Sequence, residues 1–375
     1  MNCLNIAGVC IYVLSGFFRY PFSDVHCQMI ETDVLVVGAG PAGTSCGIRL
    51  RQAGVDCLVI DRAEFPRDKI CAGGMTPRAW RLLDSIAPGF SYEYQEVRRI
   101  TLSFENQCCL DIEAAEPIRV VQRRNFDYAL LQYYISRGGC FRREAFRSVE
   151  EQEDYLLVST ISGQKIKCRY RVGADGASSL VRRHLTGKRE QGLLCVEQYC
   201  PKSPDISIDI TLSRRYDFGG YFFRFPNPAF DVLGFCDAST TPDKFRGVLK
   251  DRGLEAGRIK GQYLYLSNDY PLHPKIILIG DAGGFAHRVS YEGIYSAFVT
   301  GCNAATAIAG GLPFAEVNRG MFRRSRRDEK VAKLFYSKSF FVLLRTACRC
   351  CPRLVKAIFD AEIRHEALTF PASGR

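Results

Sequence analysis

The feature that most constrains the fold is a glycine-rich turn between an apolar run and a small-residue helix. Residues 33–37 (DVLVV) are short, apolar and rich in valine, which predicts a buried strand. Residues 41–53 carry apolar side chains at helical spacing, and Gly54 is placed to end that helix. Residues 56–61 (DCLVID) predict the next strand. The chain therefore contains a βαβ unit, whose crossover is expected to be right-handed.

The turn has the sequence GAGPAG, and each glycine has a separate physical reason. Gly38 permits the tight turn out of the strand, Gly40 lets the backbone approach a pyrophosphate, and Gly43 lets the helix pack closely on the strand. The start of the helix offers free N–H groups and its positive dipole end to phosphates. Asp61 ends the second strand, where its carboxylate can accept from ribose hydroxyls. This unit predicts an ADP-binding site without separating FAD from NAD, with contacts at Gly38, Gly40, Pro41, Ala42, Gly43 and Asp61.

A second glycine motif, GDAGG at residues 280–284, directly follows the apolar run KIILIG. Asp281 at the end of that predicted strand can bind ribityl hydroxyls. A helix over about residues 293–310 could aim its N-terminus at the flavin N1/O2 edge and stabilise negative charge there. A third motif, GADGASSLVR at residues 173–182, places an Asp-Gly pair before another helix. Together the motifs predict a two-part FAD site that also includes Asp175, Gly280, Asp281, Gly283, Gly284, Gly293 and Ile294.

These motifs resemble those of the FAD-dependent oxidoreductases related to p-hydroxybenzoate hydroxylase. Within that group the chain is most similar to the geranylgeranyl reductase family, and it resembles the bacterial CbrA-like branch. Residues 65–78 (FPRDKICAGGMTPR) resemble the family segment in which a cysteine and glycines lie against the flavin. Residues 220–226 (GYFFRFP) resemble the Y-x-W-x-F-P signature, with Phe223 where tryptophan is usual. The resemblance covers residues 31–310 and implies further cofactor contacts at Arg62, Lys69, Cys71, Ala72, Gly73 and Arg123.

The order of predicted elements indicates an α/β fold with a Rossmann-like FAD-binding domain of the p-hydroxybenzoate hydroxylase type. An antiparallel β-sheet inserted between its segments would form the substrate domain, because runs such as 206–212 and 230–236 are rich in aromatic and β-branched residues. A helical tail would follow. The expected boundaries are 1–30 for an N-terminal extension, 31–95, 119–185 and 270–312 for the FAD-binding domain, 96–118 and 186–269 for the substrate domain, and 313–375 for the tail.

Three residues near the predicted flavin are candidates for proton transfer. Cys71 could be a proton donor or redox partner, or its small side chain could simply fit a tight turn. His287 and Tyr291 could protonate a carbon that is being reduced, or could only shape the pocket. Their loop departs from the family, because Arg288 stands at the usual proline position. This departure bears on the substrate and the electron donor more than on FAD.

The resemblance implies reduction of carbon–carbon double bonds in an isoprenoid chain, by hydride transfer from N5 of the reduced flavin. NAD(P)H or another donor would reduce the flavin. Tyr221, Phe223 and Phe225 are expected to line an apolar substrate tunnel, although aromatic residues in a strand also form ordinary core. Two alternatives stay open: an NAD(P)H-dependent flavin monooxygenase, and a membrane-associated flavoprotein with a binding role.

The formal net charge of +11 is unevenly spread, since residues 319–364 carry 13 Lys/Arg against 4 Asp/Glu. With the apolar run FFVLL at 340–344, this segment could lie on the inner face of an anionic membrane, or form a solvated helical cap. No nucleic-acid recognition motif accompanies the charge, so no nucleic-acid partner is expected. We expect a cytoplasmic protein, with peripheral membrane contact through this segment as the alternative.

Cysteine usage and the N-terminus complete the expectations. The chain has 17 cysteines and five histidines, and no histidine stands beside a cysteine at zinc-ligand spacing, so we expect reduced thiols and no metal. Residues 1–18 hold no charge and predict an anchor, a processed leader, or, with a start at Met29, an extension irrelevant to the fold. The sequence does not determine the oligomeric state.

Overall fold

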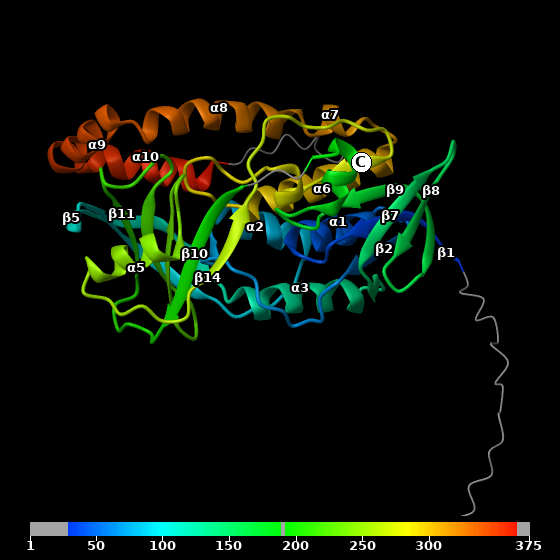
Figure 1. Cartoon of the computed structure of the whole chain (residues 1–375), viewed down its shortest axis with the longest axis horizontal. Helices are drawn as coiled ribbons and strands as arrows, with labels where there is room; N and C mark the ends of the chain where they lie inside the picture. The colour runs from blue at the N-terminus through cyan, green and yellow to red at the C-terminus, as the bar shows by residue number, and fades with distance from the viewer. Residues whose placement is uncertain (1–28, 189–191, 366–375) are drawn as a thin grey trace, which may run out of the picture.

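The computed structural model describes residues 29–188 and 192–365, as two mixed β-sheets lying side by side with helices packed on both (Figure 1). The predicted N-terminal extension, with its anchor and leader alternatives, falls on residues 1–28 and so lies outside the described residues. Across the two described ranges, no helix is both long and apolar enough to cross a membrane.

The first sheet contains the predicted βαβ unit. Its strands run in the order β6-β2-β1-β9-β8-β7, and β15 pairs with the carboxyl-terminal half of β9. β1, β2, β6, β9 and β15 are parallel, whereas β8 and β7 form an antiparallel edge that the sequence did not indicate. The bounds are β1 Ile30–Val37, β2 Cys57–Asp61, β6 Cys140–Arg143, β7 Phe146–Glu151, β8 Leu156–Thr160, β9 Lys165–Gly173 and β15 Ile276–Leu278.

Helices on the first sheet bring distant segments together. α1 (Pro41–Gln52) follows β1, and α6 (Ile294–Gly310) crosses it closely because small residues face each other. A Cβ added at Gly301 of α6 would lie 2.4 Å from Ser45 Oγ and 2.6 Å from Ala42 O. Val34 and Val36 of β1 are fully buried in the core beneath these helices, whereas Leu35 and Val37 belong to the core on the other face of the sheet. α3 (Arg123–Ser136) packs in the same core, whereas α4 (Leu180–Thr186) packs on the other face of the sheet through Val181.

The second sheet has the order β14-β10-β13-β12-β11-β4-β5-β3. It is antiparallel as predicted except for one parallel pair, β4 with β11. Helix α5 (Pro242–Lys250) packs on one face through Phe245, Val248 and Leu249. The bounds are β3 Gly74–Met75, β4 Gln95–Phe104, β5 Gln107–Val120, β10 Leu193–Cys200, β11 Ser207–Leu212, β12 Tyr221–Pro226, β13 Asp231–Cys236 and β14 Lys260–Leu264.

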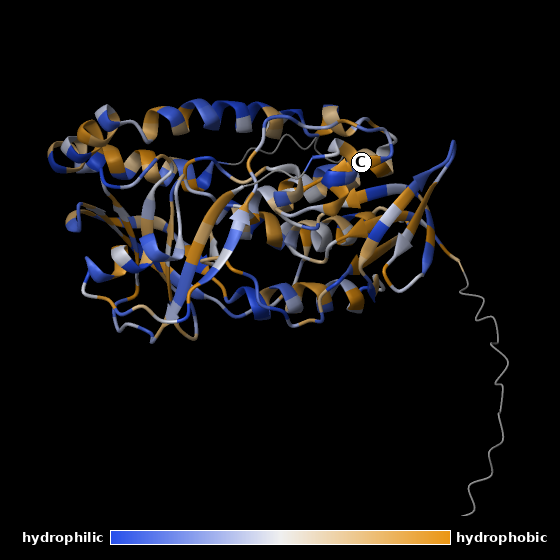
Figure 2. Ribbon diagram, viewed as in Figure 1, coloured by the Kyte–Doolittle hydropathy of each residue, from blue (hydrophilic) through white to orange (hydrophobic). Residues whose placement is uncertain are grey.

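The predicted C-terminal helical segment is confirmed, and it packs on α6 and on β5 of the second sheet (Figure 1). Phe341 of α9 meets Phe104 of β4 edge-on with ring centroids 5.1 Å apart, and Ile363 of α10 joins the core of the second sheet. Figure 2 shows α8 as a predominantly hydrophilic helix, with hydrophobic residues returning in α9. The bounds are α2 Pro77–Ile86, α7 Phe314–Val317, α8 Arg319–Phe335, α9 Lys338–Cys350 and α10 Pro352–Arg364.

Candidate active site

The turn between β1 and α1 contains two glycines required by the protein's own packing and one that faces open space. A Cβ at Gly38, whose φ is +108°, would lie 2.3 Å from Ala174 O, and one at Gly43 would lie 1.8 Å from Gly38 O. At Gly40 the added atom would meet only the flexible guanidinium of Arg67, at 3.4 Å. Open space bounded by a cation suits the pyrophosphate of FAD.

The start of α1 is also arranged for an anion. Gly40 is the N-cap and Pro41 is the first helical residue, no side chain caps the helix, and no acidic residue lies in its first turn. The N–H groups of Ala42 and Gly43 therefore belong to the helix end that attracts phosphate. These features fit the cofactor that the family resemblance implies.

Asp61 lies beside the same turn at the end of β2. Its Oδ2 accepts the Ala39 N–H and its Oδ1 accepts the Ala63 N–H, both at 2.8 Å. These bonds fix the carboxylate, and each oxygen retains a lone pair for a ribose hydroxyl. The next residue, Arg62, has an exposed side chain.

The second glycine motif contacts the first, although 240 residues separate them in sequence. Gly280, with φ +56°, has Ala42 Cβ 2.9 Å from the position of its missing Cβ. Gly293 is the N-cap of α6, and its missing Cβ would lie 3.2 Å from Asp281 Oδ1. Lys69 Nζ stands 3.9 Å from Asp281 Oδ2, and burial lowers the pKa of this lysine. The predicted Gly283, Gly284 and Ile294 lie in the same turn and helix start.

Cys71 lies in the segment before β3, next to a buried ion pair. Arg123 donates from Nε and Nη2 to the two carboxylate oxygens of Asp127, at 2.8 Å each. Burial opposes the charge of Arg123, but Asp127 and a hydrogen bond with Cys71 raise its pKa above the ordinary value. The Gly73 N–H donates to Cys71 Sγ at 3.4 Å, and Ala72 lies between them. The cysteine thus has a cation and a backbone donor beside its sulfur.

Asp175 makes contacts that stabilise a helix start. Its carboxylate accepts the Ser179 hydroxyl at 2.6 Å and the Leu180 N–H at 2.7 Å, at the beginning of α4. From the same helix, Arg182 Nη1 donates to Ala282 O at 2.9 Å and so connects α4 to the GDAGG turn. A direct contact of Asp175 with the cofactor stays a prediction.

The three aromatic residues expected to line a tunnel share one face of β12, because side chains alternate along a strand. Phe225 packs on Gly74, where a Cβ would lie 2.7 Å from Phe225 Cε1, and so contacts the segment that carries Cys71. The Phe223 ring meets the Phe225 ring edge-on at 5.7 Å. Tyr221 stacks on Tyr291 with centroids 5.8 Å apart and donates to Ser290 O at 2.8 Å.

The loop after GDAGG carries the two candidate proton donors, His287 and Tyr291, and their side chains contact different parts of the protein. Tyr291, with φ +54°, donates to Gly219 O at 3.2 Å, and burial raises the pKa of its phenol. His287 Nε2 lies 3.5 Å from Asp328 of α8 and 3.6 Å from Glu362 of α10, and burial lowers the pKa of its imidazole. These contacts favour a structural role for His287, whereas Tyr291 lies with the aromatic residues of β12.

Two features of the site were not among the predicted site residues. One is a buried cluster in which Arg78 of α2 pairs with Glu292, just before α6, and lies 3.4 Å from Glu362 of α10. The other is Glu197 of β10, a buried carboxyl whose pKa is raised to about 7 by burial. Neither stands at a recognisable spacing, because their partners come from segments distant in sequence.

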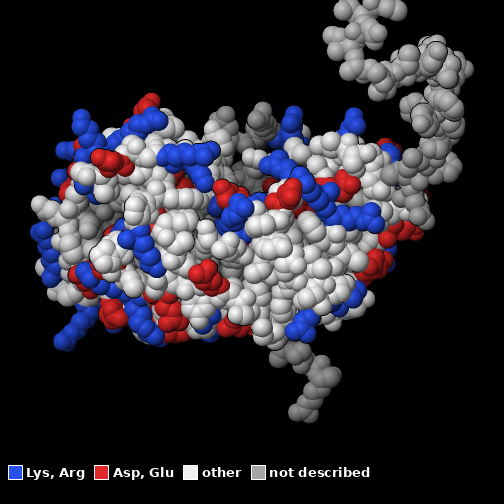
Figure 3. All heavy atoms as spheres, turned by 90° about the horizontal axis from the view of Figure 1, so that it is seen from below, with Lys and Arg blue, Asp and Glu red and all other residues white. Residues whose placement is uncertain are grey.

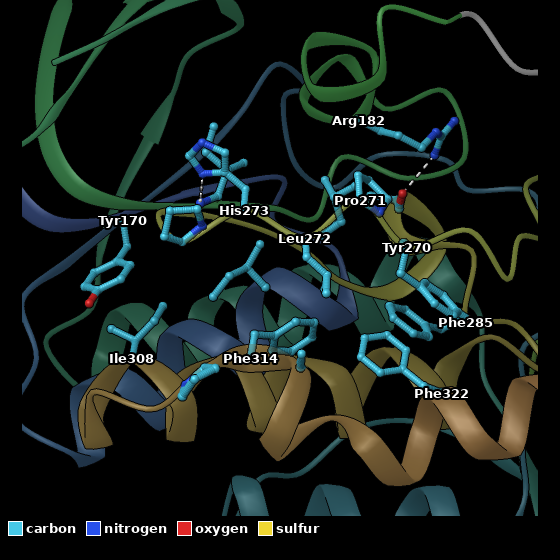
Figure 4. Close-up of a pocket in the computed structure, with 18 of the residues that line it drawn as sticks. Tyr170, Arg182, Tyr270, Pro271, Leu272, His273, Phe285, Ile308, Phe314 and Phe322 are labelled. Carbon is cyan, nitrogen blue, oxygen red and sulfur yellow. Dashed lines mark hydrogen bonds between the residues drawn. The ribbon is translucent and has the colours of Figure 1, made fainter. Parts of the chain in front are cut away.

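A cavity of about 410 Å³ lies behind the GDAGG turn, between β15 and helices α6 to α8. Figure 4 shows Tyr170 and Ile308 at one end, Phe314 near the middle, and Tyr270, Phe285 and Phe322 at the other end. Of the predicted site residues, only Gly283 lines this cavity. A hollow of about 30 Å³ lies at the site itself, where Lys69, Cys71, Arg123 and Tyr199 form part of the wall.

Comparisons with known proteins agree with this geometry. Residues 31–196 match the family described as FAD binding domain. An uncharacterized protein of Methanosarcina barkeri is 29% identical, with 84% of each chain covered. The geranylgeranyl diphosphate reductase of Rhodobacter capsulatus is 26% identical, over 74% of this chain and 75% of the relative. The menaquinone reductase of Mycobacterium tuberculosis matches locally, at 54% identity over 16% of this chain and 14% of that protein.

Solved structures share the fold. A geranylgeranyl bacteriochlorophyll reductase-like protein from Thermoplasma acidophilum superposes with a TM-score of 0.66 at 17% identity, covering 92% of this chain and 94% of that one. The flavin-dependent brominase Bmp2 superposes with a TM-score of 0.69 at 17% identity, covering 89% and 94%. Residues 31–196 thus match a FAD-binding domain, and the chain shares the fold of these solved proteins.

Proposed function

We propose that this protein reduces carbon–carbon double bonds in an isoprenoid chain, using reduced FAD. The observation that carries the proposal is the contact of the β12 aromatic face with the Cys71 segment, through Phe225 and Gly74. An apolar wall next to a thiol and a flavin-binding turn suits an alkene better than a polar substrate. The similarity to the geranylgeranyl diphosphate reductase of Rhodobacter capsulatus supports the same substrate class.

The protein's own groups would bind, orient and protonate. Gly40, the start of α1 and Asp61 would hold the ADP part of FAD, and Asp281 with the start of α6 would hold the ribityl and ring end. Bound reduced flavin supplies a hydride to one alkene carbon. Cys71 would protonate the other carbon, while Tyr221 and Phe223 keep the alkene oriented and water excluded. NAD(P)H or another electron donor would restore the reduced cofactor.

This function predicts that an isoprenoid will reoxidise the flavin without oxygen. The bound flavin is photoreduced anaerobically, and geranylgeranyl diphosphate or a geranylgeranylated lipid is added. We expect the oxidised flavin absorbance to return together with a product two hydrogens heavier. Cys71→Ala should slow this step about 100-fold, the usual contribution of a general acid. The saturated analogue is the control and should leave the flavin reduced. Failure of every polyprenyl compound to reoxidise the flavin would contradict the proposal.

A flavin monooxygenase is the second candidate, favoured by the fold that the chain shares with flavin-dependent enzymes such as the brominase. It would oxidise NADPH rapidly in air and yield an oxygenated product. In the anaerobic assay above it would leave the isoprenoid unchanged. The two candidates therefore give opposite results in one pair of experiments.

We also propose that the hairpin of α9 and α10 contacts an anionic membrane and so gives access to a lipid substrate. Val342 and Leu343 of α9 and Leu354 and Ile358 of α10 are each more than half exposed, which is unusual for large apolar side chains. Arg349 and Arg353 lie between these pairs in sequence, and both are exposed. By contrast, the face seen from below carries both signs of charge interspersed (Figure 3). Basic residues next to exposed apolar ones suit an anionic lipid surface.

The double variant Leu343→Glu, Leu354→Glu is therefore expected to bind anionic vesicles about tenfold or more weakly than the parent protein. Co-sedimentation with phosphatidylglycerol-containing vesicles measures this, and bound FAD should be unchanged. Ile161→Glu is the matched control, because Ile161 is 68% exposed and lies outside the C-terminal helices. Equal vesicle binding by all three proteins would exclude the hairpin as the contact.

A further inference from the structure

Glu197 is a carboxyl group buried where the second sheet meets the Cys71 segment. Its side chain is 2% exposed, and its Oε1 has no hydrogen-bond partner among the residues that the structure describes. Glu197 pairs with Gly234 on one side and with Lys260 of the edge strand β14 on the other. A buried carboxylate oxygen without a partner costs stability, so its presence calls for a functional explanation.

The groups around Glu197 determine when it carries a proton. Burial raises the pKa of its carboxyl most strongly. Hydrogen bonds from the Tyr199 hydroxyl and the Cys71 backbone N–H lower the pKa, as do the charges of Lys260 and Arg123. The net pKa is about 7, so that the group exchanges a proton at neutral pH.

A route to solvent runs from this carboxyl through Tyr199. The Tyr199 side chain is 37% exposed and stacks on Phe230 with ring centroids 4.3 Å apart. Tyr199 and Cys71 both line the hollow of about 30 Å³, together with Arg123. A hollow of that size and polarity can hold a water molecule. Tyr199 and Cys71 therefore share one small hollow, and the carboxyl of Glu197 reaches it through its hydrogen bond with Tyr199.

We propose that Glu197 is the proton reservoir of Cys71, recharged from solvent through Tyr199. This inference rests on the proposed function only in that the proton of Cys71 is delivered to an alkene. When Cys71 protonates the alkene, its S–H bond breaks and a C–H bond forms, and the flavin hydride supplies the electron pair for the other C–H bond. The carboxylic acid of Glu197 then gives its proton to the thiolate, through the Tyr199 hydroxyl and water in the hollow. The resulting carboxylate takes a proton from solvent.

The test is the alkylation rate of Cys71 across pH 5 to 9 in the FAD-loaded protein. Iodoacetamide is the reagent, and mass spectrometry of the Cys71 peptide separates its reaction from that of the other cysteines. In the parent protein the ionised Glu197 should oppose thiolate formation, giving an inflection near pH 7. Glu197→Gln should remove the inflection and react about tenfold faster at pH 8, with equal rates below pH 6.

Tyr199→Phe tests the route through Glu197. It removes a hydrogen bond that lowers the pKa of Glu197, so the inflection in the alkylation rate should move to higher pH. The residue that is alkylated, Cys71, is the same in this variant and in the parent protein. A merely structural Glu197 would leave the inflection in place in both variants. Identical profiles for the parent and Glu197→Gln would overturn the proposal, and so would a Cys71 that never reacts, since the hollow must be wet. Neither result depends on whether an isoprenoid reoxidises the flavin.

Discussion

Gly43→Ala is expected to abolish FAD retention and to lower the free energy of unfolding by about 3 kcal/mol, the upper range for overpacking. The added Cβ would lie 1.8 Å from Gly38 O and 3.1 Å from Ala174 Cβ. The contact with Gly38 O would force α1 away from the end of β1. Both are backbone segments, so a side-chain rotation cannot relieve the clash. α1 would move off the sheet and take its N-terminal phosphate site with it. Flavin absorbance after gel filtration and urea unfolding measure the two effects.

Gly40→Ala separates cofactor binding from packing. Its Cβ would meet only the flexible Arg67 side chain at 3.4 Å, so the free energy of unfolding of the protein without FAD should change by less than about 0.5 kcal/mol. The methyl group would fill the space assigned to the pyrophosphate, and the Kd for FAD should rise about tenfold or more. Unchanged FAD affinity in this variant would mean that the pyrophosphate does not pass Gly40.

Arg78→Met is expected to lower the free energy of unfolding by about 3–5 kcal/mol, because it leaves a buried carboxylate without its cation. Arg78 is 2% exposed and pairs with Glu292, which also accepts from the Thr76 hydroxyl at 2.5 Å. Burial alone would raise the pKa of Glu292, but Arg78 and Thr76 hold it below the ordinary value. The same arginine donates to Glu362 O at 2.8 Å, so the variant should also loosen α10.

The free energy of unfolding changes with pH in opposite directions in the parent protein and in Arg78→Met. In the parent, the lowered pKa of Glu292 contributes stability above the unfolded-state pKa, which is lost as pH falls through the folded pKa. In Arg78→Met the folded pKa rises above the unfolded one, so stability falls as pH rises from 5 to 7. Urea unfolding at several pH values measures both trends.

Two controls accompany this prediction. Adding Glu292→Gln to Arg78→Met removes the unpaired charge and should restore part of the lost stability. Glu116→Gln breaks the ion pair between Glu116 of β5 and Arg81, which lies on the same helix as Arg78. Both side chains of this pair are about one-third exposed, so the free energy of unfolding should change by less than about 1 kcal/mol. A loss below 1 kcal/mol in Arg78→Met itself would show that the cluster is too hydrated to matter.

The local parts of the FAD site could be predicted because short-range chemistry determines them. Gly38 and Gly43 follow from one tight turn, and Asp61 follows from the end of the next strand. The antiparallel second sheet was expected from its aromatic runs, but the parallel pairing of β4 with β11 was not, since strand composition carries no direction. His287 was placed at the flavin by its distance from GDAGG in sequence, whereas its ring faces Asp328 and Glu362.

The sequence by itself determined the βαβ unit and the two glycine motifs, because each depends on residues within one turn or one strand end. The combination of these motifs then indicated FAD as the cofactor. Tertiary structure alone decided the partners of Arg78, 214 residues from Glu292, and the burial of Glu197 next to the backbone of Cys71. No sequence pattern predicts whether a single Glu in a strand is buried or which charges lie near it. Its pKa depends on how much water the fold removes and on which distant charges the fold brings near.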